Sequence, residues 1–441
     1  MKVILILGAG RSSSALIQYL LEHSGAEDWK VRVGDLDPRV AEAKIGGHSR
    51  GEFFAIRQDD NGQREAEISA ADLVISMLPA PMHPAVAEVC IRCGKNLITP
   101  SYISEEMQAL HAAAVEKGVM LLNEMGVDPG IDHMSAAQIL DGLRRKGAVI
   151  NSFESFTGGL IAPACDNNPW HYKITWNPRN VVLAGAGVAA RYYEGGIQRY
   201  VPYHQLFRRI TTVDVPGHGK FEGYANRDSV KYRVLYGLDN IPTLIRGTLR
   251  RDGYCAAWNV LVQIGLTDDS VEIPNPSSLS WRQLTASFLP ESASARPEDF
   301  VKEMTGADTT TMAMLTWLGI FEERPLGIDR GSPAAALQKL IEERWILSPG
   351  DRDMIVMWHR FGYALDGQNQ WLESWLVTEG IDETYTAMAR TVGLPIAIAA
   401  RHLMNGTLFH PGVIMPMLPD IYQPVLDELN TLGICFHERI Q

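Results

Sequence analysis

The chain has 441 residues, of which 46% are hydrophobic, and its formal net charge is −12. One hydrophobic core rarely serves so long a chain, so two or three folded domains are expected. The acidic charge and a pI near 5.5 exclude a general nucleic-acid-binding protein, which would carry a basic face. No apolar run is long enough to cross a membrane, and the apolar run near the N terminus is too short for a signal peptide. We therefore expect a cytoplasmic protein.

The first predicted element is a buried parallel strand over Lys2–Leu7, which leads into a glycine-containing turn. The first glycine permits a tight turn, and the second lets the backbone approach a pyrophosphate, which the N terminus of the next helix stabilises. A serine stands where a third glycine usually lies, and it is still small enough for close packing of helix and strand. We predict that this turn binds a dinucleotide through Gly8, Gly10, Arg11, Ser12 and Ser13.

An acidic residue follows the second predicted strand, Lys30–Val33. Asp35 lies just beyond the end of that strand, where a carboxylate accepts hydrogen bonds from the ribose hydroxyls and repels a 2′-phosphate. This residue therefore favours NAD over NADP. Two alternatives stay open: Asp35 is an exposed loop residue, or Arg39 nearby serves a phosphate and the cofactor is NADP.

Polar residues also follow later strands of the same predicted sheet. A strand over Asp72–Leu78 is expected to flank the nicotinamide ribose at its carboxyl end, which places Leu78 at the cofactor. A shorter strand over Asn96–Thr99 is followed by Ser101 and Tyr102. Ligands of doubly wound sheets bind outside the carboxyl ends of the strands, so we expect both residues in the ligand crevice.

The stretch Asn123–His133, here called the seam, has the most unusual composition of the chain. It reads NEMGVDPGIDH and joins a strand-like run over 119–122 to a helix-like run beginning near Met134. Glycine, proline and several carboxylates stop regular structure there and leave charged groups at a strand end. We predict that the seam contributes Val127 and Asp128 to the crevice.

Beyond the seam, strand-like runs follow one another without regular helices, which indicates a mixed or antiparallel sheet. This region is rich in arginine although the whole chain is acidic, and guanidinium groups bind carboxylates through paired hydrogen bonds. We predict a carboxylate-binding site here. The expected strands are Phe153–Gly159, Tyr172–Trp176, Ile210–Val215 and Thr243–Arg250.

The last third of the chain is predicted to be mainly helical. Residues 268–344 read as a small helical insert, and a second helical stretch is expected over Asp351–His359, whose histidine is more often structural than catalytic at such a place. The tail over Ala387–Leu429 is expected to return and pack on the first domain. No spaced set of histidine and cysteine ligands occurs, so no catalytic metal is predicted.

Several motifs together resemble one known family. They are Gly8-Ala-Gly10-Arg11, Gly126 to His133, Gly158 to Pro163, Asn168-Pro169 with Tyr172-Lys173, Asn226 to Ser229, Arg246 to Arg250, and Ala387-Met388 with Thr391 to Pro395. Over nearly its whole length the chain resembles the saccharopine dehydrogenase family of the glutamate-forming kind, also called saccharopine reductase. The seam and the arginine motifs are specific, whereas the glycine turn is not.

The resemblance implies an α/β fold with a Rossmann doubly wound parallel sheet, a mixed-sheet α+β substrate and dimerisation domain, and a small helical domain. The expected ranges are 1–128 completed by 390–441, then 129–267 with 345–389, then 268–344. A homodimer is implied by the resemblance alone. Members use NAD or NADP, so NADP stays open beside the NAD that Asp35 favours.

Carried over position by position, the resemblance assigns Ser101, Tyr102 and Asp128 to the cofactor and substrate. It also places Arg227 and Arg246 on substrate carboxylates, with Thr248 beside them. One position departs from the family pattern, because Thr157 stands where the family has a cysteine before two glycines. Any role of that cysteine is lost in this chain, and the exact substrate is less closely defined.

The implied reaction oxidises saccharopine, a secondary amine with three carboxylates, to an imine that is hydrolysed to glutamate and 2-aminoadipate 6-semialdehyde, or runs in reverse. The candidates for proton transfer are Asp128, Lys173 and Tyr102, and water alone is the further alternative. A related dehydrogenase for another carboxylated amine, such as carboxynorspermidine, is the second hypothesis. A protein that senses NAD(H) without turnover is the third; intact arginine motifs favour an enzyme.

Overall fold

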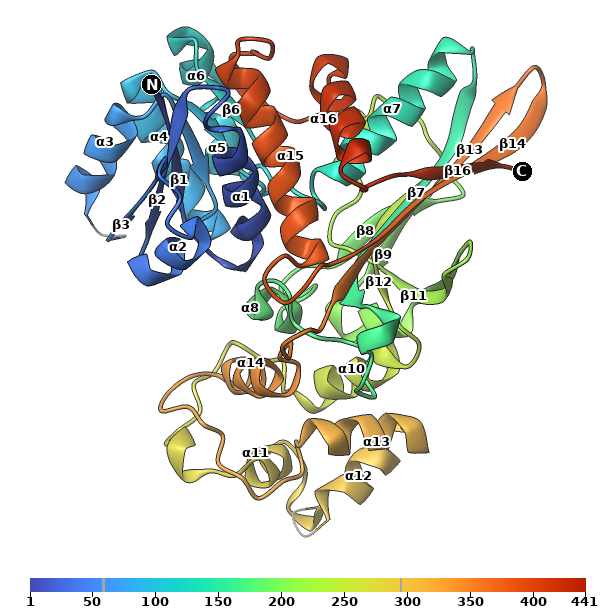
Figure 1. Ribbon diagram of the computed structural model, residues 1–441. Helices are drawn as coiled ribbons and strands as arrows, with labels where there is room; N and C mark the ends of the chain where they lie inside the picture. The colour runs from blue at the N-terminus through green and yellow to red at the C-terminus, as the bar shows by residue number, and fades with distance from the viewer. Residues whose placement is uncertain (58–59, 294–295) are drawn as a thin grey trace. The chain divides into compact units, whose positions relative to one another are not determined.

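The computed structural model describes residues 1–57, 60–293 and 296–441 (Figure 1). These residues form two compact units: the first unit is Met1–Gly147 with Leu376–Phe436, and the second is Ala148–Trp375 with His437–Gln441. This division differs from the expected ranges. The helix after the seam lies in the first unit, because it packs on a helix near the C terminus. Residues 268–344 lie within the second unit rather than forming a third.

The first unit is built on a seven-stranded sheet of parallel strands in the order β15-β6-β5-β4-β1-β2-β3, counted over the described residues. The order reverses between β1 and β4, and ligands of such sheets bind at this switch point. The predicted doubly wound sheet is confirmed. The strands are β1 (Lys2–Leu7), β2 (Trp29–Asp35), β3 (Gly51–Ala55), β4 (Leu73–Ser76), β5 (Asn96–Ile98), β6 (Met120–Leu122) and β15 (Gly412–Ile414).

Helices cover both faces of this sheet. On one face, α3, α4 and α6 share a buried core with β1 and β4. On the other, α1 runs alongside α15 (Figure 1), and a Cβ at Gly393 would lie only 2.7 Å from the backbone nitrogen of Leu16. The tail therefore returns to the first unit as predicted. The helices are α1 (Ser14–His23), α2 (Pro38–Ile45), α3 (Asn61–Ala70), α4 (His83–Cys93), α5 (Glu105–Ala109), α6 (His111–Lys117), α7 (Ile131–Arg145), α15 (Ala387–Met404) and α16 (Pro419–Thr431).

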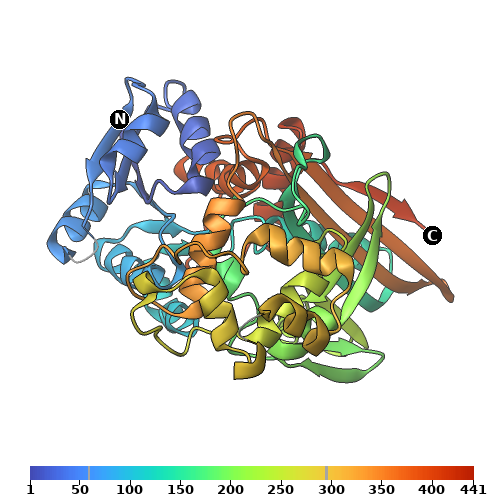
Figure 2. The ribbon, with the colours of Figure 1, turned by 90° about the horizontal axis from the view of Figure 1, so that it is seen from below.

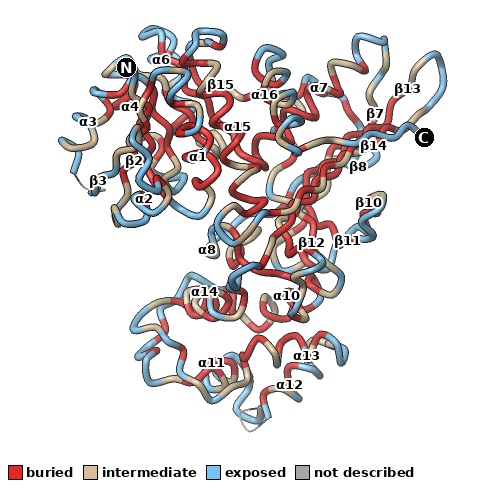
Figure 3. The backbone as a smooth tube through the Cα atoms, in the orientation of Figure 1, coloured by how far each residue is buried: buried red, intermediate tan, exposed pale blue. Residues whose placement is uncertain are grey.

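The second unit is built on a nine-stranded sheet, again counted over the described part of the chain, with the main order β10-β11-β12-β7-β13-β14-β16. Only β12 and β7 run parallel among the pairs with a stated register, so the predicted mixed sheet is confirmed. Figure 3 shows the central strands buried and the edge strand β10 exposed. The strands are β7 (Val149–Ile161), β8 (Ala190–Glu194), β9 (Ile197–Val201), β10 (Ile210–Val215), β11 (Gly219–Ala225), β12 (Thr243–Arg250), β13 (Asp353–Leu365), β14 (Gln368–Glu379) and β16 (His437–Ile440).

Two predicted elements of this unit were wrong. Asp351–His359, predicted as a helix, belongs mostly to β13, which pairs with β7 from Asp353 to Ala364. Both faces of β13 are buried, so its apolar run lacks the alternation that separates a strand from a helix. Residues 172–176, predicted as a strand, form an irregular segment. Its side chains pack into the core, and the backbone nitrogen of Ile174 donates to Trp345.

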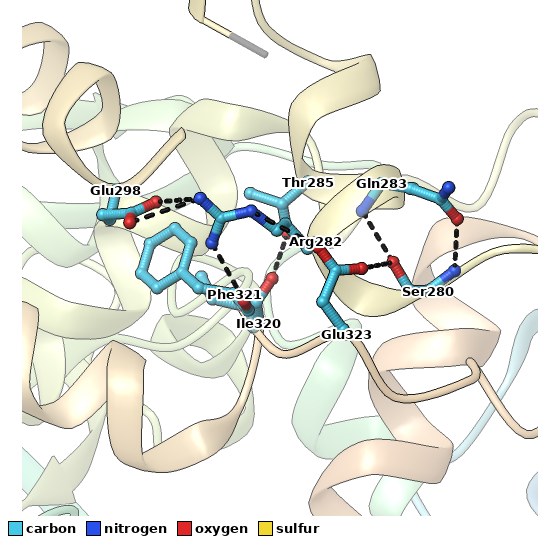
Figure 4. A network of polar contacts seen from close by, with 8 residues as sticks. All are labelled: Ser280, Arg282, Gln283, Thr285, Glu298, Ile320, Phe321 and Glu323. Carbon is cyan, nitrogen blue, oxygen red and sulfur yellow. Dashed lines mark hydrogen bonds and ion pairs between the residues drawn. The ribbon is translucent and has the colours of Figure 1, made fainter. Parts of the chain in front are cut away.

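Most helices of the second unit share one core that contains several tryptophans, including Trp170, Trp258, Trp281 and Trp345. At the end of this helical part, Arg282 binds Glu298, Glu323 and the carbonyl of Phe321, which ties three segments together (Figure 4). Figure 2 shows these helices from below; those after residue 280 are yellow to orange. They are α8 (Pro178–Val182), α9 (Tyr232–Leu235), α10 (Tyr254–Ile264), α11 (Trp281–Ser287), α12 (Pro297–Thr305), α13 (Thr309–Leu318) and α14 (Pro333–Arg344). Across the described residues, none of the helices has the length and apolar character that a membrane crossing requires.

Candidate active site

The turn after β1 is tight at its first glycine and open at its second. Gly8 has a φ of +97°, and a Cβ there would lie 3.0 Å from the carbonyl of Met77. A Cβ on Gly10 would meet nothing within 4 Å. Arg11, Ser12 and Ser13 form a short 3₁₀ turn that leads into α1, and the buried hydroxyl of Ser13 donates to the carbonyl of Gly10 at 2.9 Å. The backbone thus leaves an approach for a pyrophosphate at the N terminus of α1.

Charged side chains surround this turn. Asp35 ends β2, and its carboxylate accepts hydrogen bonds from the backbone nitrogens of Ala9 at 2.7 Å and Asp37 at 3.1 Å. From α2, the ammonium of Lys44 donates to the carbonyl of Gly10 and to the hydroxyl of Ser13 at 3.0 Å. Burial lowers the pKa of Lys44 to about 8, although Asp35 acts in the opposite direction. The turn therefore carries both a fixed carboxylate and a cation.

The carboxyl ends of β4, β5 and β6 present the other predicted residues of the first unit. Ser101 and Tyr102 follow β5 and are half-buried, as is Leu78 beyond β4. The hydroxyl of Tyr102 donates to the carboxylate of Asp128 at 2.8 Å. Asp128 is also half-buried, whereas Val127 before it is buried. The structure thus brings Tyr102 and Asp128, two of the predicted catalytic residues, into direct contact.

Behind this pair, the other carboxylates of the seam face the interior. Buried Glu124 contacts Nε2 of buried His133 at 2.8 Å and accepts a hydrogen bond from the backbone nitrogen of Ile103 at 3.0 Å. Asp132 accepts from the backbone nitrogen of Gly130 at 2.6 Å. Glu124 therefore connects the loop that carries Tyr102 to the start of α7. The sequence marked the seam as rich in carboxylates, but gave no sign that Glu124 would bind His133 rather than a ligand.

A buried histidine also lies at these strand ends, and sequence reasoning missed it. His83 begins α4, and its Nδ1 lies 2.9 Å from the hydroxyl of Ser76. Its Nε2 lies 2.8 Å from the hydroxyl of Ser101 and 3.0 Å from that of Thr99. Burial lowers the pKa of His83 to about 4, so the ring is neutral near pH 7. The only available signal was its place shortly after the fourth strand.

In the second unit, the predicted arginines lie on β12. Residues alternate between the two faces of a strand, so Arg246, Thr248 and Arg250 share one face. The intervening Gly247 is required on the opposite face, because a Cβ there would lie 2.2 Å from the ring of Phe156 on β7. Thr248 is in register with Thr157 of β7, the position where a cysteine was expected. The hydroxyl of Thr157 is buried and has no hydrogen-bond partner among the described residues.

Both arginines of this face are buried against tyrosine rings. The guanidinium carbon of Arg246 lies 4.2 Å from the ring centre of Tyr232. That of Arg250 lies 5.0 Å from the ring centre of Tyr172 and 5.1 Å from that of Tyr254. Such contacts stabilise a buried cation through the negative face of the ring. Nη1 of Arg250 also donates to the carbonyl of Leu249 at 2.9 Å. A guanidinium group carries several N–H donors in one plane, a geometry that suits a carboxylate.

Arg227 is held near the same strand by its backbone. It is exposed, with a φ of +44°, and its carbonyl accepts from the backbone nitrogen of Arg191 at 2.8 Å. Two hydrogen bonds join the loop that carries Arg227 to Arg246 of β12. The backbone nitrogen of Asn226 donates to the carbonyl of Arg246 at 2.8 Å, and the backbone nitrogen of Arg246 donates to the hydroxyl of Ser229 at 2.9 Å. The motif NRDS and the motif RGTLR, separate in sequence, therefore meet at Arg246.

Lys173 has a carboxylate partner that the sequence did not indicate. Its buried ammonium donates to Asp351 at 2.5 Å, 178 positions along the chain. Burial raises the pKa of Asp351, but hydrogen bonds from Lys173 and from the nitrogen of Ser348 outweigh that effect and lower it. His359 of β13 is fully buried, in register with Ser155, and its ring centre lies 6.0 Å from that of Phe153. Both residues are integrated into the core of the second unit.

Comparison with known families matches almost the whole chain. Residues 4–122 match the profile described as "Saccharopine dehydrogenase NADP binding domain". Residues 126–434 match the profile described as "Saccharopine dehydrogenase C-terminal domain". The boundary between the two matches falls in the seam.

Individual relatives agree with these profiles. The chain is 32% identical to a Schizosaccharomyces pombe protein named saccharopine dehydrogenase [NADP(+), L-glutamate-forming], over 100% of this chain and 99% of that protein. It is 33% identical to bovine mitochondrial alpha-aminoadipic semialdehyde synthase, but spans only 47% of that longer protein. Its structure resembles apo saccharopine dehydrogenase (L-Glu forming) from Saccharomyces cerevisiae with a TM-score of 0.88 and 29% identity over all of both chains. A homospermidine synthase from Legionella pneumophila, at 12% identity and a TM-score of 0.58, shares the fold alone.

Proposed function

The chain belongs to the saccharopine dehydrogenase family, and from this premise we propose that it oxidises saccharopine to glutamate and 2-aminoadipate 6-semialdehyde, or catalyses the reverse reductive condensation. The observation that carries the proposal is the pair of buried arginines, Arg246 and Arg250, on one face of β12 in an otherwise acidic chain. Saccharopine carries three carboxylates, and guanidinium groups are the side chains best suited to bind them.

The first unit would supply the groups that act on the amine. The nicotinamide ring, when bound, accepts a hydride from the carbon next to the amine. Asp128 is the proposed acceptor of the amine proton, and the hydroxyl of Tyr102 orients its carboxylate. Water then hydrolyses the imine. Lys173 is the weakest of the three candidates for proton transfer, because its ammonium is engaged by Asp351.

The descriptions of the relatives and the residues of this chain point to different dinucleotides. The matched N-terminal profile and the fission-yeast relative both carry NADP in their descriptions. Here, however, Asp35 ends β2 and places a negative charge at the glycine turn. The exposed guanidinium of Arg39 is paired with Asp37. A carboxylate at this position repels a 2′-phosphate, so we propose a preference for NAD, which Asp35→Ala would shift towards NADP in a comparison of kcat/KM for the two dinucleotides.

The first test is the initial rate of NADH or NADPH formation with saccharopine, on the wild type, Arg246→Ala and Arg246→Lys. We expect turnover in the wild type and a rise in KM of about 100-fold in Arg246→Ala, since a buried hydrogen-bonded charge pair is worth about 2–5 kcal/mol. Arg246→Lys keeps the charge but not the forked geometry, so it should recover only part of the loss. Arg199→Ala is the control, because its guanidinium pairs with Glu194 on the exposed β8–β9 hairpin.

If the wild type reduces neither cofactor with saccharopine, although a dinucleotide binds, the saccharopine assignment fails. Turnover with carboxynorspermidine would then favour the related-amine hypothesis, and binding without any turnover would favour a sensor of NAD(H). The homodimer and the cytoplasmic location stay predictions.

A further inference from the structure

We propose that His83 is a positioning residue for the reaction: it holds the hydroxyl of Ser101 in the orientation that the ligands at the strand ends require. The proposal rests on the proposed function, which places Ser101 at the cofactor and substrate. It gives a role to a residue that neither the motifs nor the expected ligand contacts include.

The geometry around His83 links two neighbouring strand ends of the first unit through three hydroxyl groups. Ser76 is the last residue of β4, Thr99 follows β5, and Ser101 lies two residues further on. Both ring nitrogens of His83 contact hydroxyls of these residues, at 2.8 to 3.0 Å. One imidazole therefore spans β4 and β5 where their carboxyl ends meet, beside the switch point of the sheet.

Burial differs within this group of four residues. Ser76 and Thr99 are fully buried and His83 is 2% exposed, whereas Ser101 is half-buried. Ser101 is thus the member of the group that is most accessible to a ligand. Its neighbour Tyr102 carries the hydroxyl that binds Asp128. Any constraint on Ser101 therefore acts on the residue before Tyr102, which binds the proposed proton acceptor.

A neutral imidazole limits what the hydroxyl of Ser101 can do. Such a ring has one N–H donor and one nitrogen acceptor. If Nε2 carries the proton, the oxygen of Ser101 accepts from it and the O–H is left to donate to a ligand. If Nδ1 carries the proton, Nε2 accepts and the lone pairs of Ser101 are left for a ligand. The carbonyl of Ser101 is held by the backbone nitrogen of Glu124 at 3.1 Å, so the hydroxyl is the group whose direction His83 decides.

The test is a double-mutant cycle on the full-length protein, with His83→Asn, Ser101→Ala and the double variant. Asparagine places an amide near the position of Nδ1, so it retains the contact with Ser76 and loses the contacts that Nε2 makes with Ser101 and Thr99. We expect kcat/KM for saccharopine to fall about tenfold in His83→Asn, the loss of one well-placed hydrogen bond. The same substitution in the Ser101→Ala background should have no further effect on kcat/KM.

His83→Gln is the conservative variant, because its longer side chain places an amide near the position of Nε2 and retains the contact with Ser101. It should recover most of the activity that His83→Asn loses. The matched control is His402→Gln, because glutamine places its amide near Nε2 and loses the contact that Nδ1 of His402 makes. His402 also contacts a hydroxyl, that of Thr407 at 2.9 Å. His402 lies near the end of α15, two residues before Met404, whose carbonyl accepts a hydrogen bond from Lys2. Lys2 begins β1, so this control lies at the end of the sheet opposite to the carboxyl ends of the strands.

Thermal unfolding of each variant separates positioning from stability. A lower unfolding temperature in both His83 variants, with activity lost only in His83→Asn, supports the proposal. The proposal is overturned if His83→Asn lowers kcat/KM by the same factor in the wild type and in Ser101→Ala, because His83 would then act without the Ser101 hydroxyl. If the wild type does not oxidise saccharopine, the proposed function has failed, but the same cycle on the dissociation constant of NADH still tests the link between His83 and Ser101.

Discussion

In the first unit the polar side chains at the strand ends bond to one another, whereas in the second unit the buried arginines of β12 lie against tyrosine rings. Tyr102 donates to Asp128, and Glu124 contacts His133 and accepts from the backbone nitrogen of Ile103, all within one unit. Arg246 and Arg250 are cations stacked on aromatic faces. Paired groups are held in one orientation, which suits proton transfer. Buried cations stacked on aromatic rings suit binding of an anionic substrate.

The largest expected effect among these predictions is that of Asp128→Asn on kcat. If the first unit handles the proton, the amide should lower kcat by about 10²- to 10⁴-fold, the usual range for loss of a general base. KM should change much less than in Arg246→Ala. Steady-state kinetics with saccharopine measure both constants. Asp141→Asn is the control, since that carboxylate binds Tyr422 on the helix pair α7 and α16; an equal loss there would point to folding rather than chemistry.

A second prediction concerns the buried ion pair of the second unit. Lys173→Met leaves the carboxylate of Asp351 without its ammonium, so we expect the second unit to lose about 3–5 kcal/mol of unfolding free energy. The double variant with Asp351→Asn should recover most of the loss. Because the pKa of Asp351 is lowered in the folded protein, the stability due to this pair is present above its ordinary value of 3.8 and is lost as the pH falls further. Urea unfolding at several pH values measures this; a full loss of activity without loss of stability would instead make Lys173 catalytic.

Glu124→Gln tests whether the buried polar contacts of the first unit stabilise its fold. Removing the charge opposite His133 and weakening the bond to Ile103 should reduce stability by about 1–3 kcal/mol. Glu65→Gln is the comparison, because its pair with Arg92 is half-exposed and should contribute less than about 1 kcal/mol. Thermal unfolding of both variants gives the difference. Equal small effects would mean that the interior pair contributes no more than a surface one.

The smallest expected effect concerns Lys44 at the glycine turn. Its pKa of about 8 means that its charge is lost as the pH rises through that value, so the affinity for NADH should fall about two- to fivefold between pH 7 and pH 9. Lys44→Met should bind NADH more weakly at pH 7 and show no such change. Between pH 8 and the ordinary lysine pKa of 10.5, the unfolded wild-type chain binds more protons than the folded chain at Lys44, so the stability of the wild type should rise with pH. This rise should be absent in Lys44→Met. Fluorescence titration of NADH at each pH measures the affinity; an unchanged pH profile in Lys44→Met would assign the dependence to another group.

Local sequence patterns correctly predicted those strands whose apolar and polar residues show directly which faces are buried. Lys2–Leu7 and Ile210–Val215 were predicted with the bounds that the structure has, and Thr243–Arg250 likewise. Each is bordered by turn residues and has a clear apolar or alternating pattern. Asp351–His359 was mistaken for a helix because a strand buried on both faces has no alternation to read. Tyr172–Trp176 was mistaken for a strand because buried aromatic residues do not reveal whether a backbone is paired.

By itself, the sequence established that a dinucleotide turn, a carboxylate-rich seam and an arginine-rich sheet occur in one chain, since each depends on residues within a few positions of one another. The partners of these residues came from the folded chain alone. Lys173 meets Asp351 across 178 positions, and His83 joins the ends of β4 and β5 only because those strands are neighbours in the sheet. Hydrogen bonds act over about 3 Å whatever the separation along the chain, so strand order and packing determine which polar groups meet.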